Sequence, residues 1–144
     1  MIHTEEHIPY KALIIDDQST ICAIYSKILK DLGVTYVSTS NTGTHGLKNY
    51  MTEDPDIVLL DIKMPGMDGL DVLKEIRAFD PDSNVIMLTS VSDKETVISS
   101  VQKGAKSYIL KTEEAAAVKQ RLKSIFRKLD FNRNHIFRNI RKSA

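Results

Sequence analysis

Short apolar runs alternate with amphipathic stretches along most of the chain. The apolar runs are five to seven residues long and mostly rich in β-branched residues, which predicts strands. The expected strands cover residues 11–16, 34–39, 57–61, 84–90 and 107–111. In the stretches between and after them, apolar residues recur at helical spacing. Helices are therefore expected over 19–33, 41–51, 70–79, 93–104 and 113–129.

Most of the strand cores are apolar throughout instead of alternating in polarity. Such strands are typical of a parallel sheet that is covered on both faces. Strands that alternate with helices five times, joined by right-handed crossovers, predict a doubly wound α/β fold. We expect a five-stranded parallel sheet in the flavodoxin-like order 2-1-3-4-5, with helices on both faces.

Helix-terminal residues refine these boundaries. Ser19 and Asp93 are the expected N-caps of the first and fourth helices. The apolar face of the first helix is expected to contain Ile21, Ile24/Tyr25, Ile28 and Leu32. Cys22 lies in the same pattern, so we interpret it as a plain buried thiol.

Carboxylates stand where two strands of the expected sheet end. Asp16 and Asp17 end the first strand, and Asp61 ends the third. The strand order makes these two strands neighbours, so the three carboxylates converge at one edge of the sheet. A single acid after a strand is usually a helix cap or a turn former, but Thr89 and Lys111 also end strands on this rim.

Three carboxylates in one place repel each other, by about 3 kcal/mol for a pair about 5 Å apart at an effective dielectric near 20. Protonation or a bound cation must relieve this repulsion. All-oxygen ligands favour a hard ion, and Mg²⁺ fits best, with Mn²⁺ as the alternative. A cation, the Lys111 ammonium and a hydroxyl around Asp61 would stabilise a phosphoryl group. Asp61 is therefore a candidate acyl-phosphate nucleophile, and the stiff loop "KMPGMDG" after it would hold it in place.

This combination of residues resembles the receiver domain of bacterial response regulators. The residues that carry the resemblance are Asp16, Asp17, Asp61 with "KMPGMDG", Thr89, Ser90, Tyr108 and Lys111. It covers roughly residues 10 to 127, and it implies that Asp61 is the phosphoacceptor for a histidine kinase or phosphotransfer protein. It also implies that Asp16, Asp17, Asp61 and the backbone carbonyl of Lys63 bind the metal ion.

The resemblance further implies a switch in two-component signal transduction. Lys111 pairs with phosphorylated Asp61, Thr89 and Ser90 approach the phosphoryl group, and Tyr108 turns inward. The surface of the fourth helix, fifth strand and fifth helix then changes for a downstream target protein. The family usually has a proline after the lysine, joined by a cis peptide, but Thr112 stands there. Because a cis bond without proline costs roughly 3 kcal/mol, we predict a trans bond.

Three other interpretations stay open. A Mg²⁺-dependent aspartyl-phosphate hydrolase of the haloacid dehalogenase type would use similar chemistry, but it carries a second Asp where this chain has Lys63. A flavin-binding protein is the second alternative, because "SNTGTHG", residues 40–46, resembles the phosphate loop of flavodoxins, but that turn follows the second strand instead of the first and is better interpreted as a helix N-cap. A receiver that folds but is not phosphorylated is disfavoured because every expected site residue is present. A non-enzymatic signalling module is therefore the leading hypothesis.

Charge divides the chain of 144 residues into two parts. Residues 119–144 carry nine Lys or Arg and one acid, about +8, and the remaining residues carry eleven bases and eighteen acids, about −7. We predict an N-terminal arm over 1–10, a receiver domain over 11–127 and a basic extension over 128–144. No separate DNA-binding output domain is expected, because this extension is too short for one.

The basic extension leaves several hypotheses open. It is either a continuation of the last helix or a separate short helix, with Ile136, Phe137 and Ile140 on one face. It could be a solvated terminus, a surface for a partner or a homodimer through the last helices, or a contact for nucleic acid or an anionic membrane. The acidic N-terminus is unlike a signal peptide and no apolar run suggests a membrane span, so a cytoplasmic location is expected.

Overall fold

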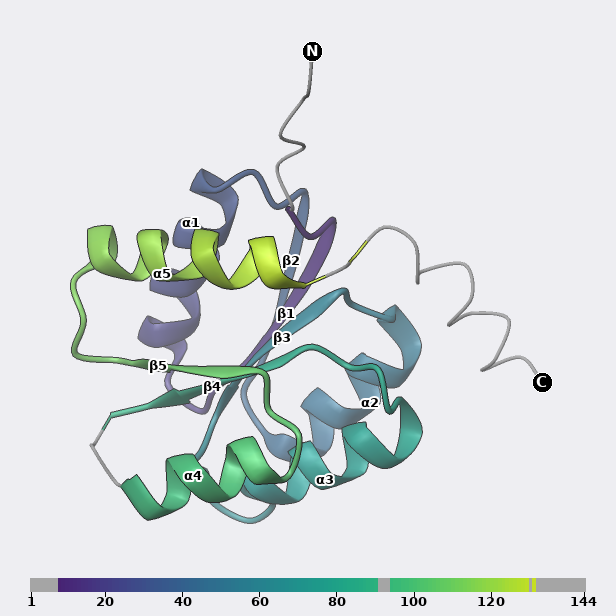
Figure 1. The fold of residues 1–144 in the computed structure, drawn as a ribbon. Helices are drawn as coiled ribbons and strands as arrows, with labels where there is room; N and C mark the ends of the chain where they lie inside the picture. The colour runs from purple at the N-terminus through teal and green to yellow at the C-terminus, as the bar shows by residue number, and fades with distance from the viewer. Residues whose placement is uncertain (1–7, 91–93, 130, 132–144) are drawn as a thin grey trace.

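A computed structural model describes residues 8–90, 94–129 and 131, with the side chain of Lys94 left out. Within these ranges five strands alternate with five helices (Figure 1). The strands are β1 (Lys11–Ile15), β2 (Tyr36–Ser40), β3 (Ile57–Asp61), β4 (Val85–Thr89) and β5 (Ser107–Leu110). The helices are α1 (Ser19–Asp31), α2 (Gly43–Glu53), α3 (Gly69–Phe79), α4 (Lys94–Gln102) and α5 (Ala115–Lys128).

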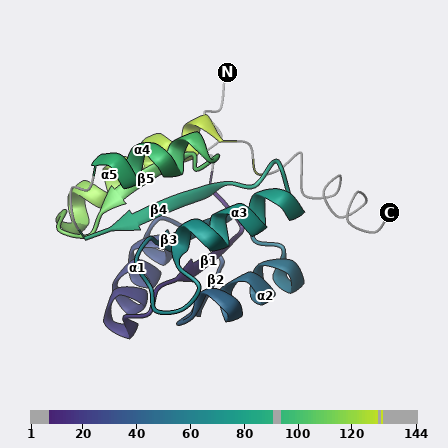
Figure 2. The same cartoon turned by 90° about the horizontal axis from the view of Figure 1, so that it is seen from below.

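All five strands are parallel and lie in the order β2-β1-β3-β4-β5. Helices α1 and α5 cover one face of the sheet, and α2, α3 and α4 cover the other (Figures 1 and 2). The predicted fold class and strand order are therefore confirmed. In this order β1 lies between β2 and β3, and it pairs with β3 in parallel, so the carboxyl ends of β1 and β3 lie side by side.

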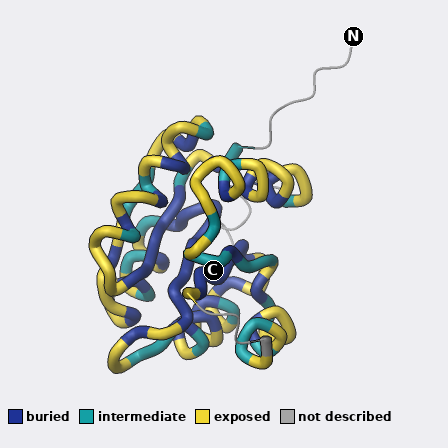
Figure 3. Tube along the Cα trace, turned by 90° about the vertical axis from the view of Figure 1, so that its left-hand side faces the viewer, coloured by how far each residue is buried: buried dark blue, intermediate teal, exposed yellow. Residues whose placement is uncertain are grey.

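Alternate residues of the central strands supply two hydrophobic cores. Ala12 and Ile14 of β1 pack under α1 and α5, whereas Leu13 and Ile15 pack under α2 and α3. The three inner strands are buried almost throughout, and exposure is concentrated on the outer surfaces of the helices (Figure 3). This double burial explains why the strand sequences do not alternate in polarity.

Two details of α1 differ from the predictions. The N-cap is Gln18 without a side-chain cap, and Ser19 is already the first helical residue. Ile24 is 47% exposed, so of the predicted pair Ile24/Tyr25 only Tyr25 is buried, while the predicted Ile28 is buried as well. The buried residues of this helix are Cys22, Tyr25, Ile28 and Leu29. The buried thiol of Cys22 is confirmed, and the predicted cap Asp93 lies outside the described residues.

The chain remains packed past the end of α5. The helix ends at Lys128 and Leu129 is extended, so a straight continuation of the helix is wrong at this point. Phe131 is buried and meets Phe126 edge to face, with ring centroids 5.8 Å apart. The core thus includes a residue beyond 127, and the predicted short helix farther on lies outside the described residues. Among the described helices, none has the length and apolar content needed for a membrane crossing.

Candidate functional site: an acidic cluster at the carboxyl edge of the sheet

Asp16 comes directly after β1 and is held by the backbone around it. Its amide donates to the Ser40 carbonyl, and its Oδ1 accepts from the Gln18 amide at 2.9 Å. The side chain is fully buried, whereas Asp17 beside it is exposed. One carboxylate is therefore fixed inside the rim and the next lies at its solvent edge.

Asp61, the last residue of β3, is followed by a tightly closed loop. The loop returns to the strand where the Gly69 amide donates to the Ile62 carbonyl at 2.8 Å. A Cβ at Gly69 would collide with the Asp61 carbonyl oxygen, and Gly66 has a φ of +72°, so the turn requires both glycines. Asp68 then begins α3 with a reciprocal capping box to Asp71. The loop is thus fixed at both ends, which restricts the position of Asp61.

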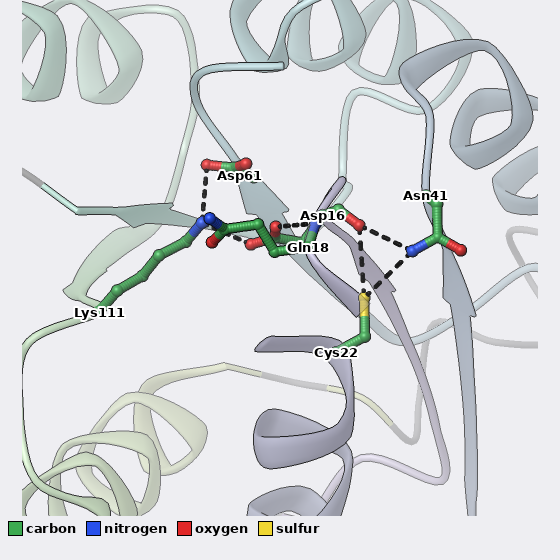
Figure 4. A network of polar contacts seen from close by, with 6 residues as sticks. All are labelled: Asp16, Gln18, Cys22, Asn41, Asp61 and Lys111. Atoms are coloured by element: carbon green, nitrogen blue, oxygen red, sulfur yellow. Dashed lines mark hydrogen bonds and ion pairs between the residues drawn. The ribbon is translucent and has the colours of Figure 1, made fainter. Parts of the chain in front are cut away.

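The three acids converge as predicted. Asp16, Asp17 and Asp61 each offer an oxygen, and these oxygens all lie within 4.8 Å of one another. The Lys111 ammonium lies 2.6 Å from Asp16 Oδ2 and 3.1 Å from Asp61 Oδ1, so it bridges the two buried acids (Figure 4). Side chains from β1, β3 and the end of β5 therefore meet at one point.

The negative charges of this cluster are only partly balanced by Lys111. Burial, and then repulsion from Asp16, raises the pKa of Asp61 from 3.8 to about 6, although Lys111 opposes the shift. Burial also works against the charge on Lys111, but its hydrogen bonds to Asp16 and Asp61 outweigh that effect and raise its pKa. One lysine partly compensates three carboxylates.

The donor set fits a hard divalent ion. It consists of carboxylate oxygens, one of them solvent-exposed, and such a set suits Mg²⁺, which keeps several waters and takes one or two carboxylates. Lys63 is exposed in the loop that leaves Asp61, close in sequence to the cluster. The metal-ligand role of its carbonyl stays a prediction.

Two of the predicted switch residues, Thr89 and Ser90, lie on the same rim, whereas Tyr108 lies within β5, opposite Met87 of β4. Thr89 is the buried last residue of β4, and its carbonyl accepts from the Lys111 amide at 2.8 Å. Ser90 follows and is exposed. Tyr108 is half-buried on β5, with the Arg121 guanidinium 6.0 Å from the centre of its ring. Arg121 also pairs with Glu113 at 2.6 Å, so it connects α5, β5 and the loop between them.

The bond after Lys111 is trans, as predicted from Thr112. No cis peptide occurs in the described part of the chain, which includes this bond. The loop closes instead through a turn in which the Glu113 amide donates to the Leu110 carbonyl at 3.1 Å. Lys111 nevertheless reaches the acids, so the missing proline does not displace its side chain from the site.

Asn41 is a site residue that sequence reasoning missed. Its side-chain amide donates to the Asp16 carbonyl at 3.1 Å, and the Cys22 thiol approaches the same oxygen at 3.4 Å (Figure 4). Burial raises the pKa of this thiol. The signal was available, because Asn41 follows β2, the neighbour of β1 in the sheet. The turn around it, 40–46, is the start of α2, with Thr42 accepting from the His45 amide.

Comparison with known sequences adds independent support. Residues 12–123 match the model of the response regulator receiver domain family. The chain is 38% identical over 112 residues to the chemotaxis protein CheY of Listeria monocytogenes, covering 78% of this chain and 94% of that protein. It is 38% identical over 121 residues to the chemotaxis protein CheY-3 of Vibrio cholerae, covering 83% and 93%.

Solved structures show the same likeness. A response regulator receiver domain protein from Clostridium thermocellum superposes with a TM-score of 0.74 at 32% identity, covering 82% of this chain and 94% of that one. The CheX-CheY-BeF3-Mg complex from Borrelia burgdorferi contains a chain with a TM-score of 0.76 at 34% identity, covering 87% and 95%. In both cases the structural likeness covers more than four fifths of this chain.

Proposed function

Because the chain belongs to the response regulator receiver family, we propose that it is a signalling module switched by phosphorylation of Asp61. The observation that carries the proposal is the convergence of three carboxylates with the Lys111 ammonium at the carboxyl edge of the sheet. A carboxylate oxygen of Asp61 attacks the phosphorus of a phosphohistidine. The phosphorus–nitrogen bond breaks, and the imidazole leaves.

Asp16, Asp17 and Asp61 would hold Mg²⁺, with the Lys63 carbonyl as a further oxygen donor. The ion, when bound, would neutralise the charge that develops on the phosphoryl oxygens. Asp16 keeps its position through the Gln18 amide, and Asn41 holds the adjoining carbonyl. The solved complex of the Borrelia protein with BeF3 and Mg supports this ligand chemistry for a relative.

The switch would use the residues around Lys111. Lys111 leaves Asp16 to pair with the phosphorylated Asp61, and Thr89 and Ser90 supply hydroxyl donors. Tyr108 turns inward, away from Arg121, and this changes the surface of α4, β5 and α5. Such a change is a population shift between two states, and a downstream target protein would read it. A histidine kinase or phosphotransfer protein would supply the phosphoryl group.

The direct test is phosphorylation with acetyl phosphate, followed by intact mass. Wild-type protein with Mg²⁺ should gain the mass of one phosphoryl group, and Asp61→Asn should gain none. Asp82→Asn is a matched control, because Asp82 is exposed beyond the opposite end of the sheet. Modification of Asp61→Asn to the wild-type extent would overturn the assignment. Turnover of a phosphate ester by the wild type would instead favour the hydrolase interpretation.

A further inference from the structure

Asn41 lies beside Asp16, on the side away from Asp61 (Figure 4). It stands between the end of β2, which pairs with β1, and the start of α2. Its side-chain amide reaches across to the neighbouring strand end, where it donates to the Asp16 carbonyl at 3.1 Å and approaches the Cys22 sulfur at 3.9 Å. Asn41 therefore contacts the backbone of the acidic cluster and not its carboxylates.

The Asp16 carbonyl lies just past the end of β1, where the hydrogen bonds of the sheet stop. Within the described part of the chain, its donors are two side chains, the Asn41 amide and the Cys22 thiol at 3.4 Å. A thiol is a weak donor, so the amide is the main partner of this oxygen. Because a peptide unit is planar, the bond that holds this carbonyl also fixes the amide nitrogen of Asp17.

The two acids joined by this peptide differ in how much they depend on it. The Asp16 carboxylate is buried and held on both oxygens, by the Gln18 amide at 2.9 Å and the Lys111 ammonium at 2.6 Å. Asp17 is exposed, yet one of its oxygens lies within 4.8 Å of oxygens of the other two acids. The direction in which Asp17 leaves the backbone therefore depends on the peptide that Asn41 holds.

From these contacts we infer that Asn41 is a positioning residue for Mg²⁺ binding, which acts through Asp17 by holding the peptide between Asp16 and Asp17. The inference rests on the proposed function, because it concerns the same metal ion. Residues that orient metal ligands from behind typically change metal affinity by about 10-fold to 100-fold when they are replaced. Since Asn41 is exposed, its replacement leaves no cavity in the core.

An NMR titration of the full chain with Mg²⁺ tests this role. Asn41→Ala should bind the ion about tenfold more weakly than the wild type. Asn49→Ala is the matched control, because Asn49 donates to the Ser40 hydroxyl at 2.6 Å, beside the same strand end, and does not contact the acids. It should bind as the wild type does. Equal affinities of wild type, Asn41→Ala and Asn49→Ala would overturn the inference.

The isosteric variant Asn41→Asp separates the lost hydrogen bond from a change in charge. A carboxylate has the shape of the amide but only accepts hydrogen bonds, so the Asp16 carbonyl loses its donor. The added negative charge alone would favour a cation, and weaker Mg²⁺ binding by Asn41→Asp is therefore the signature of the missing donor. Binding as tight as in the wild type, or tighter, would overturn the inference.

A double-mutant cycle tests whether Asn41 acts through Asp17. In an Asp17→Asn background, Asn41→Ala should change the Mg²⁺ affinity less than twofold, because the charge to be positioned is gone. A tenfold loss in both backgrounds would contradict this route.

The metal-free protein gives a second readout. The Asp17 amide signal should shift in Asn41→Ala and stay in place in Asn49→Ala, and an unshifted signal in Asn41→Ala would overturn the inference even if the double variant bound no ion. Absence of Mg²⁺ binding by the wild type is a different result, because it would remove the proposed metal site together with this inference.

Discussion

The two ends of the sheet use the same residue type for different purposes. At the amino-terminal end, buried aspartates are held by hydrogen-bond donors: Asp56 accepts from two backbone amides, and Asp80 accepts from the Tyr50 hydroxyl at 2.8 Å. At the carboxyl end, Asp16 and Asp61 lie against each other with one lysine between them. Acids paired with hydrogen-bond donors stabilise the fold, whereas acids crowded against each other create a site that favours the binding of a cation.

The largest expected effect on stability is at the amino-terminal end of the sheet, where the aspartates are paired with hydrogen-bond donors. Asp56→Ala should lower the free energy of unfolding by about 3 kcal/mol, because two charge-assisted hydrogen bonds are lost and backbone amides are left without an acceptor. Chemical denaturation measures the change. Glu75→Ala, at an exposed position of α3, is the control and should change stability by less than about 0.5 kcal/mol. Equal losses in both variants would remove the structural role assigned to Asp56.

At the carboxyl end of the sheet, where the acids are crowded, a substitution is expected to increase stability. Asp61→Asn should raise the free energy of unfolding of the metal-free protein at pH 7 by about 1–3 kcal/mol, because it removes a buried charge whose pKa is raised to about 6. Denaturation in the presence of a chelator measures this gain. Asp17→Asn should give a smaller one, since Asp17 is exposed. Destabilisation by Asp61→Asn would show that the carboxylates are not in conflict.

The pH dependence of the free energy of unfolding tests the same repulsion between the carboxylates. A folded-state pKa near 6, above the ordinary 3.8, means that the folded protein holds this proton more tightly than the unfolded chain does. The contribution of Asp61 to stability is thus fully present below pH 3.8 and is lost as the pH rises through about 6, by up to about 3 kcal/mol. The difference between wild type and Asp61→Asn, measured by denaturation from pH 4 to pH 7, isolates it. A difference that does not change with pH would contradict the raised pKa.

The smallest effect is expected at the rim of the carboxyl end. Arg121→Gln should lower the free energy of unfolding by about 0.5–1 kcal/mol, because it removes a partly exposed ion pair with Glu113 and a cation–π contact with Tyr108. Arg121→Lys should retain part of this stability. Thermal unfolding of the two variants measures the difference, and a larger loss in Arg121→Lys than in Arg121→Gln would exclude the contact with the ring.

The sequence predicted the parallel sheet from a general rule, and it predicted the strand order and the meeting of the acids from the flavodoxin-like precedent for such sheets. Uniformly apolar strands require a covered parallel sheet, and parallel strands bring Asp16 and Asp61 to the same edge. The trans bond before Thr112 followed equally from the energy of a cis peptide. These features depend on the chain being an ordinary doubly wound sheet, and little on how individual side chains pack.

The packing of individual side chains could not be predicted from such rules. Helical spacing left the pair Ile24/Tyr25 unresolved, and it is the rotation of α1 against the sheet that buries Tyr25 and exposes Ile24. Asn41 was assigned only to a turn, since its contact with the Asp16 carbonyl depends on how closely two strand ends approach. The packing of Phe131 under α5 depends on the extended residue Leu129, which the helical pattern did not indicate.

Calorimetric titration of Mg²⁺ into metal-free protein near pH 6 tests the account most directly. The crowded carboxylates predict one Mg²⁺ bound per chain, with protons released on binding because the ion displaces the proton held by Asp61. Asp16→Asn and Asp61→Asn should bind far more weakly, while Asp82→Asn should bind as the wild type does. Absence of binding, or equal binding by all four proteins, would contradict a metal site between β1 and β3.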